Sequence, residues 1–179
     1  MTALLRTAFL VICIALLSGC SAVYSIHPVG EQPLTLVPEE WEGTWLHQEG
    51  TVTVAVTDSA KGFIEIGWVE KRQNRLAFET YPVQLLKYGD WLFGNVHDRD
   101  KTGHHLWGRV RKDDGQLTLW APDVAKIKTL VVQDVLPGRL INDGEDVVLD
   151  ELSAAHMLVI VEGTVLEWGR PLVFLRLTQ

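Results

Sequence analysis

Residues 51–57 have the sequence Thr-Val-Thr-Val-Ala-Val-Thr, which is the clearest structural signal in the chain. Its three valines alternate with other residues, and this period of two is typical of a β-strand with one buried face. After a turn, residues 63–68 repeat the alternation with Ile64, Ile66 and Trp68. Two such runs joined by a short turn predict an antiparallel hairpin, with these three side chains on one face.

More short apolar runs follow, and most are bounded by turn residues. The further predicted strands are residues 75–81, 83–86, 91–97, 106–111, 116–120 and 171–177. Hairpin-length connections predict an antiparallel up-and-down meander that curls into a barrel, so we expect a mainly β fold. Pro82 has no N–H group for a sheet, so it predicts a bulge, an edge or a break between two strands.

The middle strands are apolar on both faces, as the alternation of Leu92 and Val96 with Trp91 and Phe93 shows. A sheet with one wet face would not have this pattern. We therefore expect residues 122–163 to cover the outer face.

Residues 122–163 are predicted to form a small, partly helical insert before the last strand. Asp123 is suited to cap a helix whose apolar stripe extends to Val135, before Pro-Gly ends it. For residues 153–162 two interpretations remain open: a helix capped by Ser153, or a buried strand.

The first nineteen residues have the three parts of an export signal. Arg6 precedes an apolar run over residues 8–17, and the small residues Ser18 and Gly19 follow. A spanning helix needs about 20 apolar residues, which is more than this run provides. We therefore predict a signal peptide at residues 1–19.

Leu17-Ser18-Gly19-Cys20 resembles the lipobox of bacterial lipoproteins. The resemblance implies cleavage before Cys20, a diacylglycerol on its sulfur, acylation of the new amino terminus and attachment to a membrane through these chains. Because Ser21 is not Asp, it also implies sorting to the periplasmic face of the outer membrane of a Gram-negative cell. The alternative is an ordinary signal peptide cleaved near Gly19.

Residues 20–38 contain three prolines and little periodicity, so we expect an extended tether before a single β-rich domain at residues 39–179. The formal charge of −7 argues against a nucleic-acid partner, which would require a basic face. Residues 24–30 (Tyr-Ser-Ile-His-Pro-Val-Gly) and 90–93 (Asp-Trp-Leu-Phe) resemble small proteobacterial lipoproteins. That resemblance implies no particular activity.

Residues 39–45, Glu-Glu-Trp-Glu-Gly-Thr-Trp, resemble the opening of lipocalin-type barrels, where a short helical turn precedes Gly-x-Trp. The resemblance implies an eight-stranded barrel and an arginine near the chain end that packs on Trp45. Arg170 and Arg176 are the candidates. The helical insert before the last strand departs from that family.

Catalytic motifs are weak in this sequence. His97, His104 and His105 are the best metal-ligand candidates, yet adjacent histidines on a strand point to opposite faces, which favours a solvated, charged turn. No Gly-x-Ser-x-Gly motif occurs, and the mature chain would retain only the acylated Cys20. We therefore expect no enzyme activity and no cofactor beyond the covalent lipid.

The sequence contains seven tryptophans, and large aromatics either fill a barrel or line a pocket. The four side chains that we expect inside the barrel, as core or as pocket, are Trp45, Ile64, Ile66 and Trp68. Two functions remain in competition. One is a module that binds an apolar small molecule or lipid, and the other is a structural lipoprotein without a pocket that docks on an envelope protein.

Overall fold

The computed structural model describes residues 21–48, 50–72, 75–98, 103–163, 165–167 and 170–177, and for residues 69–72 and 75–77 it describes the backbone only. The predicted signal peptide and the lipobox residues Leu17, Ser18, Gly19 and Cys20 lie outside these ranges. The prediction of an acylated Cys20 therefore stays a prediction.

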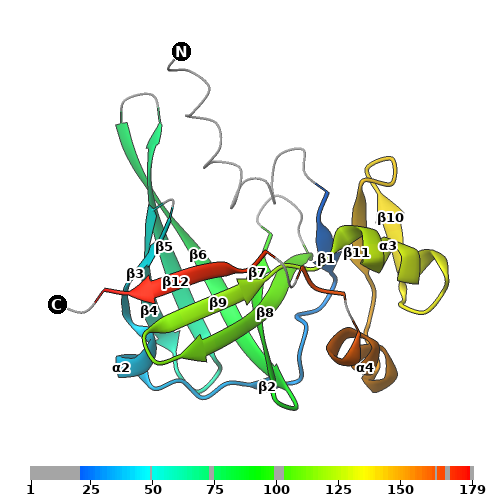
Figure 1. The fold of residues 1–179 in the computed structure, drawn as a ribbon, viewed down its shortest axis with the longest axis horizontal. Coiled ribbons are helices and arrows are strands. Elements are labelled where there is room, and N and C mark those ends of the chain that lie inside the picture. Colours follow the sequence, from blue (N-terminus) through cyan, green and yellow to red (C-terminus); the bar gives the residue numbers. More distant parts are fainter. Residues whose placement is uncertain are drawn as a thin grey trace.

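Eight strands form a closed antiparallel barrel (Figure 1). Consecutive strands pair with each other from β3 through β9, and β12 closes the ring by pairing with both β9 and β3. The predicted meander and barrel are confirmed. The strands are β3 (Gly43–His47), β4 (Gly50–Asp58), β5 (Phe63–Arg72), β6 (Arg75–Tyr88), β7 (Trp91–His97), β8 (His105–Asp113), β9 (Gln116–Trp120) and β12 (Leu172–Arg176).

Pro82 lies within a single long strand, so the expectation of separate strands on its two sides was wrong. In β6, Pro82 pairs with Glu65 of β5, whereas pairing with β7 begins only at Val83. At Pro82, the side of β6 that faces β7 is therefore not paired with β7. The proline has no N–H group to donate there. Of the three alternatives, the edge position is the one that the structure shows.

Residues 21–38 pack on the domain, and the predicted tether was wrong for them. The short strand β1 (Val23–Ser25) lies between β8 and β11 (Asp146–Leu149), with which it runs parallel. β2 (Gln32–Pro33) pairs with β6. Between these strands the buried Asn95 side chain accepts a hydrogen bond from the Val29 N–H group at 2.6 Å and donates to the Val29 carbonyl at 3.0 Å.

This segment resembles a tether in sequence because its strands have only three and two residues, too few for a period to appear. Their partners lie far away along the chain, up to 124 residues in the case of Ala22 and Asp146. Long-range pairing therefore gives order to a segment whose local pattern predicts none.

The insert contains two helices and a hairpin. α3 (Val124–Val132) is capped by Asp123, whose side chain accepts a hydrogen bond from the Lys126 N–H group. The helix ends before Val135, earlier than predicted. The hairpin joins β10 (Gly138–Ile141) to β11. α4 (Ala154–Glu162) settles the open choice for residues 153–162 as a helix, with a capping box between Ser153 and His156.

Two apolar cores lie on opposite faces of the barrel wall. The interior core includes Trp45 and Ile64. A second core joins the outer face of β7, β8 and β9 to the insert, and buries Phe93 and Trp107 against residues such as Ile127 and Ile160. The prediction that residues 122–163 cover the outer face is confirmed, and Figure 1 shows the insert beside the barrel.

Candidate functional site

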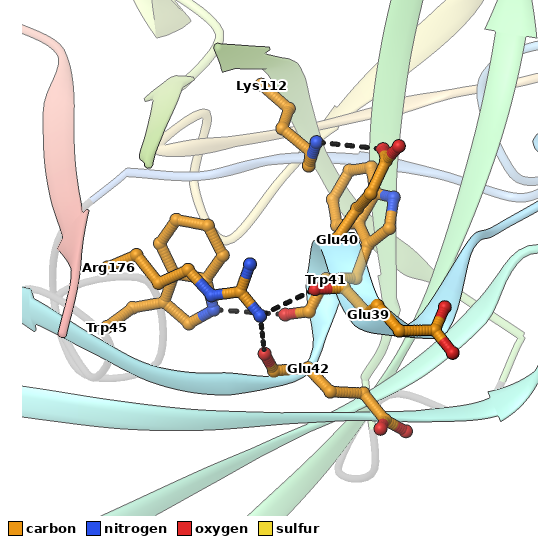
Figure 2. Close-up of polar contacts among 7 residues, drawn as sticks. All are labelled: Glu39, Glu40, Trp41, Glu42, Trp45, Lys112 and Arg176. Carbon is orange, nitrogen blue, oxygen red and sulfur yellow. Dashed lines mark hydrogen bonds and ion pairs between the residues drawn. The ribbon is translucent and has the colours of Figure 1, made fainter. Parts of the chain in front are cut away.

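The short helix α2 (Pro38–Trp41) lies at one end of the barrel (Figure 1), and Figure 2 shows the polar contacts around it. Trp45 is fully buried beneath it, and its Nε1 donates to the Trp41 carbonyl at 3.1 Å. The Arg176 guanidinium lies 5.7 Å from a Trp45 ring centroid. Its Nη2 donates to the carbonyls of Glu39 at 2.7 Å and Glu42 at 2.6 Å. Arg176, rather than Arg170, is thus the arginine that packs on this tryptophan.

The α2 end also carries a shallow charged depression of about 250 Å³. Within it Lys112 Nζ lies 3.0 Å from Glu40 Oε2 and 5.7 Å from a Trp41 ring centroid. The side chains of Arg176 and Lys112 are therefore occupied in holding α2 in place. We interpret the α2 end as a structural seal. The depression is lined by Glu39, Glu40, Lys112, Asp114, Gly115 and Arg176.

The four residues expected inside the barrel divide into two pairs. Trp45 and Ile64 have exposed fractions of 0% and 4%, so they belong to the core. Ile66 and Trp68 also pack against the interior core, but both remain partly exposed. Of the four, only Ile66 and Trp68 present surface that a ligand could cover.

Neighbouring strands place more side chains on the same inner face, because directly paired residues share a face of the sheet. Tyr81 pairs with Ile66, and Glu79 pairs with Trp68. The Tyr81 hydroxyl donates to Glu79 Oε2 at 2.6 Å. This hydrogen bond sets a polar pair beside the apolar wall.

The aromatic wall continues on β3 and β12. His47 follows Trp45 by two residues, so it also points inward, and its ring centroid lies 5.1 Å from that of Phe174. His47 is the last residue of β3, whereas α2 precedes the first. Figure 1 shows the β5–β6 hairpin on the side opposite α2. We call the partly exposed inward residues near this end the far-end cluster: His47, Ile66, Trp68, Glu79, Tyr81 and Phe174.

Four of these six residues were missed by sequence reasoning. Alternation alone identifies Ile66 and Trp68, but His47, Glu79, Tyr81 and Phe174 join them only through the register of pairing between strands. A single sequence carries no direct signal of that register.

The histidine candidates divide in the way that adjacent strand positions predict. His97 and His105 pair across β7 and β8 with ring centroids 5.1 Å apart, whereas His104 lies 5.9 Å from the Tyr24 ring. Burial lowers the pKa of His105, and His97, His27 and His104 lower it further by their charge. Within the described part of the chain, no group of three or more His, Cys, Asp or Glu residues is arranged to hold a metal ion.

No protein-family model, curated protein or solved structure matches this chain. None of the helices among the described residues has the length and apolar character needed to cross a membrane. The class of protein is therefore defined by the fold itself, a closed eight-stranded antiparallel barrel with a helical insert.

Proposed function

We propose that this protein is a lipid-anchored, non-catalytic module that binds an apolar small molecule or lipid at the far end of its barrel. The observation that carries the proposal is the far-end cluster, whose inward aromatic side chains remain partly exposed while Trp45 and Ile64 are buried. The anchor rests on the lipobox resemblance at Cys20. The same resemblance implies that the protein is attached to the periplasmic face of the outer membrane.

The size of the barrel supports this function. A barrel of eight strands is just wide enough for side chains to fill it or for one small ligand to enter. Here large side chains fill the α2 end, and Arg176 helps to hold the seal. A ligand that covered about 100 Å² of apolar surface on the far-end cluster would gain roughly 2.5 kcal/mol from burial alone. The hydrogen-bonded pair of Tyr81 and Glu79 would orient a polar group of that ligand.

The alternative, an envelope lipoprotein that docks on a protein partner, is favoured by one feature of the outer wall. Leu175 of β12 pairs directly with Leu46 of β3, and Leu177 follows on the same face. Their exposed fractions are 52%, 42% and 48%, respectively. This stripe is apolar and lies on the opposite face from the far-end cluster.

One pair of variants separates the two functions. We would titrate the mature protein with the uncharged fluorophore N-phenylnaphthylamine and follow energy transfer from tryptophan. Trp68→Ala should weaken probe binding about tenfold, because a large aromatic side chain contributes about 1–2 kcal/mol to the binding free energy through its contacts. The control Leu46→Ser changes the outer face of the same wall and should leave binding unchanged.

The reverse outcome would favour the docking function: probe binding that is insensitive to Trp68→Ala but lost in Leu46→Ser. The anchor is tested separately by growth with a fatty-acid probe. Cys20→Ala should abolish the label, and undiminished label in that variant would exclude acylation at this residue.

A further inference from the structure

Two residues after Cys20 the chain is already hydrogen-bonded into the sheet. The Ala22 N–H group donates to Asp146 Oδ1 at 2.8 Å, and the Ala22 carbonyl accepts the Val147 N–H group at 2.9 Å. Ala22 is only 1% exposed. The chain is therefore held in the sheet from its second residue after Cys20.

Covalent geometry limits how far this point can lie from the acylated residue. Consecutive Cα atoms are 3.8 Å apart, so Ala22 lies within about 8 Å of Cys20. The headgroup layer of one leaflet is itself roughly 5–8 Å thick. A tether as long as residues 20–38 would have allowed about 60 Å when fully extended.

The β10–β11 turn lies beside this attachment point. Asp146, which binds Ala22, also accepts a hydrogen bond from Asn142 Nδ2. Asn142, Asp143 and Glu145 of the turn are exposed, as is Ser21. Residues 21–22 and the turn 142–145 therefore form one surface, which we call the anchor-side surface.

We propose that the anchor-side surface rests directly on the headgroups of the lipid bilayer, so that the barrel is held against the membrane rather than suspended from it. This proposal rests on the acylation of Cys20 proposed above. Its partner is a lipid surface, because the acylated residue would lie within about 8 Å of Ala22, which is hydrogen-bonded into the sheet.

The charge of this surface determines how it is held. The turn contains Asp143 and Glu145 but no lysine or arginine, and the nearby Arg139 is paired with Asp150 at 2.7 Å. Anionic lipids attract basic segments, so they offer this turn no electrostatic attraction. The acyl chains hold the surface in place, and unacylated protein should not bind vesicles at any salt concentration.

Depth-dependent quenching tests the proposal on the full lipidated protein. In the acylated mature chain an introduced cysteine is the only free thiol, because Cys13 leaves with the signal and Cys20 carries the lipid. We would label Glu145→Cys in the turn and, as a control, Asp114→Cys in the exposed β8–β9 turn beside α2, across the molecule from β10 and β11 (Figure 1). Both proteins go into phosphatidylcholine vesicles that contain a headgroup nitroxide.

The label at residue 145 should be quenched at least about threefold more strongly than the label at residue 114, since only the first lies within reach of the headgroup layer. Insertion of twelve Gly and Ser residues between Ser21 and Ala22 should remove the difference, because such a linker spans roughly 19 Å on average.

Two results would overturn the proposal, and they are distinguishable. Equal quenching at the two sites in vesicle-bound protein would show that the domain is not seated on the bilayer, and would leave the anchor intact. Failure of the purified protein to float with vesicles would exclude the acyl anchor, and the seating with it.

Discussion

The two ends of the barrel contain the same kinds of aromatic residue but bury them to different extents. At the α2 end, Trp45 is buried because α2 and Arg176 cover it, and Trp41, the last residue of α2, is buried as well. At the far end, Trp68 and Tyr81 point inward but remain partly exposed. The number of aromatic side chains therefore does not determine how deeply each barrel end is buried. The covering element α2 determines it.

Truncation of the buried tryptophan should give the largest effect. Trp45→Ala should lower the free energy of unfolding by about 3–5 kcal/mol, because it removes a fully buried ring and its hydrogen bond to Trp41. Trp68→Ala should lower it by only about 1–2 kcal/mol, because this ring is partly exposed. Urea denaturation measures both values. Equal losses would contradict the distinction between a packed end and a partly exposed end.

The second-largest effect on stability is expected at Arg176, which holds the seal at the α2 end. Arg176→Ala removes hydrogen bonds from a charged donor to the carbonyls of Glu39 and Glu42, and should lower the free energy of unfolding by about 1–2 kcal/mol. The matched control is Arg111→Ala, because Arg111 forms an exposed ion pair with Asp113, and such pairs contribute less than about 1 kcal/mol. A control variant as destabilised as Arg176→Ala would show that Arg176 does not hold the seal.

The smallest expected effect is a pH dependence of the free energy of unfolding. It arises from His105, which pairs with His97 at the end of the barrel away from α2. The pKa of His105 is lowered from 6.5 mainly by burial, so the unfolded chain binds this proton more readily than the folded chain. The free energy of unfolding should therefore decrease as the pH drops below about 6.5. It should stop decreasing once the pH is below the pKa of His105 in the folded protein. His105→Gln should make the decline shallower in thermal unfolding between pH 7 and 5. An unchanged decline would exclude this histidine as its source.

Much of the barrel could be predicted because its strands carry a local signal. The alternation at residues 51–57 and 63–68 lies in β4 and β5, and the final run at residues 171–177 contains β12. The resemblance of Gly43-Thr44-Trp45 to the opening of lipocalin-type barrels also implied an arginine that packs on Trp45, with Arg170 and Arg176 as candidates. Local periodicity succeeds here because a half-buried strand needs one apolar face.

The rest depends on pairings between distant residues. β1 is only three residues long and is ordered by pairing with β8 and β11, so the sequence alone predicts a tether for the segment from Ser21 to Pro38. The far-end cluster likewise needs the register of β5 and β6, which sets Tyr81 opposite Ile66. Neither relation leaves a local pattern.

An antiparallel meander with an apolar inner face and a covered outer face follows from the sequence alone, because side-chain alternation is a property of each strand. The sequence also contains the lipobox-like segment from which the proposed anchor follows. Only contacts in three dimensions show which end of the barrel is sealed, which inward side chains stay partly exposed, and that Ala22 is already held in the sheet. These features depend on contacts between residues far apart in the chain, such as Ala22 with Asp146 and Glu39 with Arg176.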